Sequence, residues 1–354
     1  MTTDDDDLLP PPLHTRLVRC GALDADATPS HGLPWWLQLL QTAAAWLAAI
    51  LVVGGFLGAF LSAAESGGTM IMLGVAVLFG ALAILRQPAS FIRQTGVPLS
   101  LAGQLMIAGG LLMLNQAENW NSMLWLCAAL AAALTWPSAP SLHRVLCACV
   151  ALGCALVALD DTVLRSALLL LCASTAVALL LLRVRWADKR HAPLLRAWLH
   201  ACAATALLGT WVNDYALVGF GFSMEEGGAL PLQAFRVLAG LACLLPIATT
   251  AWLAWREQVP FRAAGLLAML ALSVTAWWIP GAAVALALLL AAWQACDRPW
   301  SALAALALIA FVSLFYYHLA VTLLFKSALL AAAGLVLLAL ALARRAARSR
   351  SLQP

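Results

Sequence analysis

The sequence contains few charged residues. Only 10% of its 354 residues are Asp, Glu, Lys or Arg, whereas 64% are hydrophobic. This composition leaves too little polar surface to cover a water-soluble protein, so it excludes soluble enzymes and nucleic-acid-binding proteins and indicates an integral membrane protein surrounded by the lipid bilayer. Because the long apolar runs lack a two-residue alternation, the segments that cross the membrane are predicted to be helices rather than strands. The expected fold class is an all-α, polytopic transmembrane helix bundle.

Common catalytic signatures are also missing. The sequence has no phosphate-binding glycine loop of the Walker type, no GxSxG and no HExxH, which argues against ATP hydrolysis and metal-dependent proteolysis. The nine cysteines form no CxxC motif or recognised Cys/His ligand spacing, and most lie within apolar runs, where a thiol behaves as a small hydrophobic group. We therefore expect no structural disulfide, no zinc site and no cofactor.

The apolar runs divide into segments long enough for membrane-spanning helices, which need roughly 20 residues each. A polar cytoplasmic tail (residues 1–38) is expected to precede the transmembrane domain (39–343), and a basic cytoplasmic tail (344–354) to follow it. The N-terminus has no basic region leading into an apolar stretch, so neither a cleavable signal peptide nor an early signal anchor is expected. About twelve spans are predicted, at 39–61, 69–85, 97–114, 122–136, 145–159, 166–182, 197–212, 234–255, 263–279, 281–295, 301–317 and 320–343.

The distribution of basic residues supports this division independently. If both termini are cytoplasmic, all twenty Lys and Arg residues except Arg165, Arg236 and Lys326 fall on the cytoplasmic side, as the positive-inside rule requires. Tryptophans give a second indication, because all but Trp46 and Trp125 lie at or near predicted span ends. The chain is therefore predicted to be a multi-pass protein of the bacterial inner membrane.

The most basic loop, 183–196, lies close to the midpoint of the chain. It could separate two halves of six spans each, split at 183–197, as in membrane proteins built from structural repeats. Because no residue-level repeat relates the two halves, a simple charged cytoplasmic loop is an equally good interpretation.

An ionisable group at the centre of a span costs about 2.5–3.5 kcal/mol, so such groups are functional candidates. Lys326 is the clearest case. On one continuous helix His318, Thr322 and Lys326 would share a face, with Tyr316 and Tyr317 beside them. This candidate polar cluster could bind an anionic headgroup, an anionic ligand or an outer-side carboxylate. Alternatively, Lys326 extends to the outer interface and the tyrosines belong to the aromatic belt.

Two secondary candidates lie in and after the third predicted span. Gln104 is flanked by small residues that let helices approach closely, so its amide is expected to bond across a helix interface rather than to a ligand. Asn115 begins a polar stretch at the outer end of this span, which is more typical of a hydrated turn than of a site. No catalytic, cofactor-binding or metal-binding residue is assigned.

The string FYYHLAVTLLFKSALLAAAGLVLL at 315–338 resembles the ending of a bacterial family of multispanning membrane proteins catalogued as domain of unknown function 4401. The stretches LAGQLMIAGGLLML and WWLQLL look similar too, so the resemblance covers roughly residues 35–343. The family implies no established activity. Its members are often encoded beside another membrane protein family, named for a GDYxxLxY motif, and the resemblance therefore implies a membrane complex.

Three functions are compatible with these observations. The favoured one is a non-catalytic membrane partner or scaffold subunit, because catalytic signatures are missing and the resemblance implies a partner. A transporter for a small molecule is the alternative, motivated by the number of spans. A membrane enzyme acting at the outer face, with Lys326 and His318 in its site, is the third.

Overall fold

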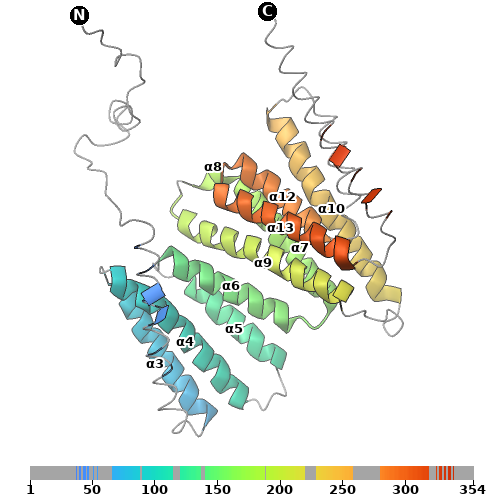
Figure 1. Cartoon of the computed structure of the whole chain (residues 1–354). Coiled ribbons are helices and arrows are strands. Elements are labelled where there is room, and N and C mark those ends of the chain that lie inside the picture. The colour runs from blue at the N-terminus through green and yellow to red at the C-terminus, as the bar shows by residue number, and fades with distance from the viewer. Residues whose placement is uncertain are drawn as a thin grey trace, which may run out of the picture.

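The structure is a computed structural model, and it describes residues 66–87, 90–114, 120–136, 140–187, 189–219, 229–257 and 280–318, with isolated positions nearer both ends. Every regular element in these ranges is a helix, as the sequence predicts. Figure 1 shows them side by side, from α3 at one edge to α10 at the other. The helices are α3 (Gly67–Leu85), α4 (Ser90–Leu114), α5 (Trp120–Leu134), α6 (Ser141–Ala158), α7 (Thr162–Leu181), α8 (Arg183–Trp186), α9 (Ala192–Gly219), α10 (Ala229–Glu257), α12 (Pro280–Gln294) and α13 (Arg298–His318).

Each predicted span within the described ranges overlaps one of these helices. The spans predicted at 39–61, 263–279 and 320–343 lie outside those ranges. Helices α9 and α10 extend beyond the predicted 197–212 and 234–255. These two helices are longer than the predicted spans because backbone hydrogen bonding, and not apolarity, determines where a helix ends.

Several of these helices are suited to a bilayer. Within the described part, four helices are long and apolar enough to cross a membrane: α3, α4 over Ile92–Leu114, α6, and α7 over Val163–Leu181. Shorter apolar helices include Pro280–Gln294 and Trp120–Leu134. Length and composition together therefore support a membrane protein.

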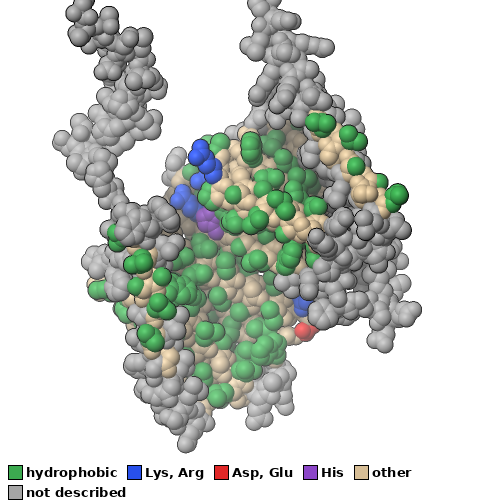
Figure 2. Space-filling model, in the orientation of Figure 1, with side chains coloured by type: hydrophobic (Ala, Val, Ile, Leu, Met, Phe, Trp, Pro, Cys, Tyr) green, Lys and Arg blue, Asp and Glu red, His purple; other side chains and the backbone are tan. Residues whose placement is uncertain are grey.

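Large apolar side chains lie on the outside of these helices. Met72 on α3 is 74% exposed, Leu105 on α4 is 72% exposed and Leu208 on α9 is 68% exposed. Figure 2 shows such side chains spread over the visible face of the described part. A water-soluble monomer rarely exposes apolar surface on this scale, whereas lipid tails solvate it at no cost.

Glycines spaced by seven residues bring the backbones of α3 and α4 close together. Gly67 and Gly74 on α3 and Gly96, Gly103 and Gly110 on α4 form what we call the glycine seam. A Cβ atom on Gly103 would lie 2.9 Å from the Gly74 carbonyl oxygen, and one on Gly110 would lie 2.6 Å from the Gly67 carbonyl oxygen. A seven-residue repeat keeps one seam in contact along two helices, and small residues there permit the close approach on which packing in membranes depends.

Buried side chains form two main clusters. Helices α3 to α6 contribute the smaller one, which contains Leu78, Ile107, Leu134 and Cys147. The larger one is formed mostly by α7, α9, α10, α12 and α13, and α6 packs against α9 between the two clusters. Helix α7 lies before the basic loop in the sequence, but it packs with helices that follow this loop. The division of the transmembrane domain into two halves at 183–197 therefore stays a prediction.

Arg165, a basic residue on the predicted outer side, has a local role. Its Nη2 donates to the Leu159 carbonyl at 2.8 Å and its Nε to the Leu156 carbonyl at 3.3 Å. These carbonyls lie at the C-terminal end of α6, where a helix leaves acceptors unpaired and a positive charge is favourable. Arg165 is thus a helix-capping residue, which gives a local reason for a basic residue on the side predicted to be outer.

The turn between α12 and α13 contains a residue with positive φ. Cys296 has φ 53°, in the region that favours glycine. Its N–H donates to the Trp293 carbonyl at 3.1 Å, and the Asp297 N–H donates to the Ala292 carbonyl at 2.9 Å. This is the hydrogen-bond pattern of a Schellman cap, and it places Asp297 directly before α13.

Replacing Cys296 with glycine should stabilise the protein by about 1 kcal/mol, because glycine adopts this φ without a steric cost. Thermal unfolding of the purified protein in detergent would show a higher midpoint. Cys296→Ala, which keeps a Cβ atom, should leave the midpoint nearly unchanged. Equal shifts in the two variants would attribute the effect to loss of the thiol instead of the backbone.

Candidate functional site

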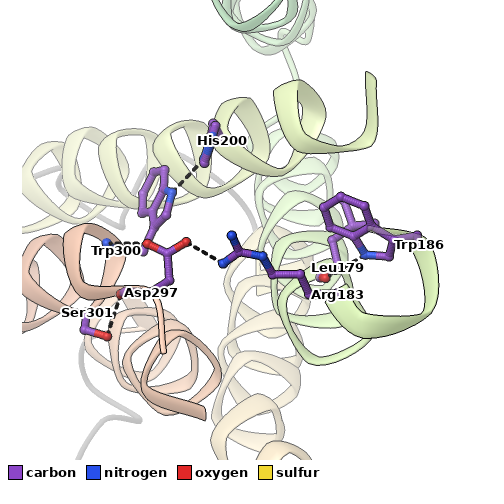
Figure 3. A network of polar contacts seen from close by, with 7 residues as sticks. All are labelled: Leu179, Arg183, Trp186, His200, Asp297, Trp300 and Ser301. Carbon is purple, nitrogen blue, oxygen red and sulfur yellow. Dashed lines mark hydrogen bonds and ion pairs between the residues drawn. The ribbon is translucent and has the colours of Figure 1, made fainter. Parts of the chain in front are cut away.

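Polar side chains from segments far apart in the sequence meet at one end of α7, α9 and α13 (Figure 3). Arg183, in the short helix α8 that follows α7, places its Nη1 3.0 Å from Oδ2 of Asp297, 114 residues further along the chain. Trp300 and His200 complete the group, which we call the Arg183–Asp297 network. The Asp297 side chain is 14% exposed and that of Arg183 is 38% exposed, so the ion pair is partly shielded from solvent.

Asp297 also fixes the start of α13. Its Oδ1 accepts from the Trp300 backbone N–H at 3.3 Å, while its other carboxylate oxygen accepts from Arg183. An aspartate at this position satisfies a backbone donor that the first turn of a helix leaves unpaired. One carboxylate therefore holds the first turn of α13 and joins it to α8.

The indole of Trp300 connects α13 to α9. Its Nε1 donates to Nδ1 of His200 at 2.6 Å, and the two rings are stacked with centroids 5.6 Å apart. Nearby, Trp186 donates from Nε1 to the Leu179 carbonyl at 2.9 Å, which folds α8 back onto α7. Figure 3 shows Asp297 between Arg183 and Trp300, with His200 beyond the indole.

Trp300→Phe should cost about 1 kcal/mol of stability, because it keeps most of the ring packing and removes the hydrogen bond to His200. Unfolding of the detergent-solubilised protein would measure the loss. Trp293→Phe is a matched control, since Trp293 lies near the end of α12 with its side chain 76% exposed. A loss of the same size in the control would show that the His200 contact contributes nothing.

The chemistry available to the Arg183–Asp297 network is limited. Arg183 and Asp297 neutralise each other, and the Trp300 N–H occupies Nδ1 of His200. Groups paired in this way serve better as connections between helices than as acids, bases or nucleophiles. The network is a structural junction of α8, α9 and α13.

A second polar group is buried between α4 and α6. Ser100, His143 and Cys147 are 0% exposed and Gln104 is 8% exposed. Ser100 Oγ lies 2.9 Å from Nε2 of His143, and Gln104 Nε2 donates to Cys147 Sγ at 3.6 Å. The Gln104 amide thus bonds across a helix interface. We call these four residues the buried α4–α6 site.

The candidate residues near the C-terminus are largely outside the described part. Tyr316, Tyr317 and His318 end α13, and their side chains lie outside the described residues, as do Thr322 and Lys326. Asn115 lies outside them too. The candidate polar cluster remains a prediction.

The sequence interpretation missed most of the polar residues that the structure brings together. In the sequence, Arg183 is part of a basic loop, and Asp297 and Trp300 lie between the spans predicted at 281–295 and 301–317 without any motif. His143 and Cys147 are four residues apart, and this spacing on a helix places them on one face. That spacing was the one available signal.

A family model described as domain of unknown function, DUF4401, matches residues 34–345. The chain belongs to this family. Within this DUF4401 match lie the glycine seam, the Arg183–Asp297 network and the buried α4–α6 site. No curated protein and no solved structure matches the chain.

Proposed function

We propose that this DUF4401 protein is a multi-pass protein of the bacterial inner membrane and serves as a non-catalytic partner or scaffold subunit for another membrane protein. The observation that carries this proposal is the Arg183–Asp297 network, whose members pair with one another. Such pairing rigidifies the junction of three helical segments. A rigid apolar bundle is suited to positioning a second membrane protein, because the described helices expose large apolar side chains such as Met72 and Leu105 on their outer surface.

The proposed topology has twelve spans and cytoplasmic termini. Basic side chains support this orientation: Arg185, Lys189 and Arg190 are exposed around the α8–α9 connection, and Figure 2 shows Lys, Arg and His gathered at the end where α8 lies. The positive-inside rule assigns that end to the cytoplasm. A single-cysteine variant retaining Cys296, which is exposed in the α12–α13 turn, tests this assignment. An impermeant maleimide should label it only after the inner membrane is permeabilised; labelling of intact spheroplasts would overturn the orientation.

The scaffold role is tested in native membranes. Tagged protein, crosslinked before detergent extraction, should carry one other membrane protein in a fixed ratio. Deleting the chain should lower the steady-state amount of that partner, and the wild-type gene should restore it. Recovery of the chain alone, with no membrane protein changed in amount on deletion, would reject the proposal.

A small-molecule transporter is the second candidate, and Pro246 within α10 favours it. Proline removes the backbone hydrogen bond to Ala242, four residues earlier, and transporters use such interruptions to build sites within spans. Uptake into proteoliposomes over a broad substrate panel tests this alternative, with Pro246→Ala as the matched variant. Flux that the variant abolishes would favour transport over the scaffold role.

A further inference from the structure

The connection from α7 to α9 carries an excess of positive charge. Residues 183–196 contain five basic residues and one acidic residue, Asp188. Arg183 is paired with Asp297, but other cationic side chains and one imidazole are exposed to solvent. We call these exposed residues the α8–α9 basic surface: Arg185, Lys189, Arg190 and His191. Their side chains form no ion pair or hydrogen bond with the described part of the chain, so they are available to an anionic ligand.

Hydrogen bonds hold this connection in one conformation. The Lys189 N–H donates to the carbonyl of the buried Trp186 at 3.1 Å, and the Lys189 carbonyl accepts from the Ala192 N–H at 2.9 Å. At the start of α9, the Leu194 N–H donates to the His191 carbonyl at 3.1 Å. Because these backbone donors are already occupied, an anion at this surface would be bound by side chains and not by the helix N-terminus.

Exposed apolar groups lie beside these charges. The side chain of Trp136, just after α5, is 72% exposed, and its ring centroid lies 6.2 Å from that of His191. Val184 on α8 is 77% exposed. Helix α7, which is apolar enough to cross a membrane, ends at Leu181, directly before the connection. Tryptophan is enriched at the level of lipid headgroups, so cationic and apolar groups meet here at the depth where headgroups lie.

We propose that the α8–α9 basic surface and Trp136 bind the headgroup of an anionic phospholipid. Such a lipid carries a negative phosphate and apolar chains in one molecule, and it therefore matches both parts of the surface. Lys189 and Arg190 contact the phosphate oxygens, while Trp136 and Val184 lie against the glycerol and the upper acyl chain. Zwitterionic phospholipids also contain phosphate, but the cation in their own headgroup offsets its charge. The surface therefore selects the anionic class.

The site lies where the two groups of packed helices meet. Trp136 follows α5, whose Leu134 belongs to the smaller buried cluster, whereas His191 directly precedes α9, which belongs to the larger one. One bound lipid therefore contacts both groups of helices at the same end of the bundle. The proposal goes beyond the scaffold role. It requires only that this end of the bundle lies at a membrane surface, whichever side of the membrane that is.

The test is native mass spectrometry of the full-length protein in detergent, titrated with dioleoyl phosphatidylglycerol or dioleoyl phosphatidylcholine. Wild type should bind one phosphatidylglycerol more tightly than phosphatidylcholine. Each Lys or Arg near an anionic lipid surface contributes about fivefold in affinity, so Lys189→Gln combined with Arg190→Gln should weaken phosphatidylglycerol binding by roughly 25-fold. The matched control is Arg86→Gln combined with Arg93→Gln. It removes two exposed charges from α3 and α4, at one edge of the bundle (Figure 1), and should bind within about threefold of wild type.

Two further measurements keep the test decisive if the glutamine variant fails to fold. Lys189→Arg combined with Arg190→Lys keeps both charges and should bind phosphatidylglycerol as wild type does. Binding by wild type should weaken by roughly tenfold when ammonium acetate is raised from about 0.1 to about 0.5 M, because exposed charges are screened. Affinity that does not change with salt would mean purely apolar binding and would overturn the proposal.

Other results would also overturn it. Equal weakening in the two glutamine variants would mean a general attraction to basic charge instead of a site. Equal affinity for the two lipids would show that the surface does not recognise the anionic headgroup. Displacement of the lipid by an equal concentration of inorganic phosphate would identify a site for a free anion. Binding of poly-glutamate without binding of phosphatidylglycerol would identify an acidic protein segment as the ligand.

Discussion

Replacing Gly103 with leucine should separate α3 from α4 and cost about 3 kcal/mol or more of stability. A Cβ atom at this position would lie 2.9 Å from the Gly74 carbonyl oxygen and 3.0 Å from the Leu78 backbone nitrogen. Both are backbone atoms of α3, so no side-chain rotation relieves the overlap and the two helices must move apart. Denaturation in mixed detergent micelles would measure the loss.

Gly80→Leu is the matched control for this prediction. Gly80 lies on α3 outside the glycine seam, and a Cβ atom there meets nothing within 4 Å. Leucine has the higher helix propensity, so this change should be neutral or stabilise the protein by up to about 1 kcal/mol. If both leucine variants lost stability equally, the cost would reflect glycine removal in general, and the seam would not be what holds α3 against α4.

The seam illustrates how far the sequence could be interpreted. The apolar runs that predict α3 and α4 are longer than a helix in a soluble protein requires. The thickness of the bilayer sets the length of a helix that crosses it. The seven-residue glycine spacing is also visible in the sequence, as in Gly96, Gly103 and Gly110. This spacing does not identify the helix against which the glycines pack. The contact between α3 and α4 depends on a register that only the packed backbones define. The same limit applies to α6, whose apolar composition does not reveal that it packs against α9.

The polar sites were harder to predict for a related reason. Arg183 and Asp297 are 114 residues apart, and nothing local to either residue identifies the other. Basic loops are common at the cytoplasmic ends of spans, so the predicted topology alone is enough to account for Arg183 in the sequence. Conversely, Lys326 stood out because a charge within an apolar run is rare. A sequence identifies a charged residue that is unusual in its own apolar run. It does not identify two charged residues that only the fold brings together.

The buried α4–α6 site shows a second limit. A cysteine in an apolar run usually acts as a small hydrophobic group, and Cys147 does contribute to a buried apolar cluster. The His143–Cys147 spacing is one of many i, i+4 pairs in a helical protein. The pair stands out only in the structure, where Ser100 and Gln104 from α4 contact His143 and Cys147.

Asp297→Ala should lower stability by about 2 kcal/mol, since it removes both the cap of α13 and the partner of Arg183. Asp297→Asn separates the two contributions: asparagine still caps a helix and lacks the charge, so it should lose about 1 kcal/mol. In a double-mutant cycle with Arg183→Gln, the Asn variant should show a coupling energy of about 0.5–1 kcal/mol that shrinks with added salt, because the Arg183 side chain is 38% exposed. The cycle isolates the ion pair that joins α8 to α13. Additive losses at low salt would mean that Asp297 acts through the helix cap alone and that the network does not tie these segments together.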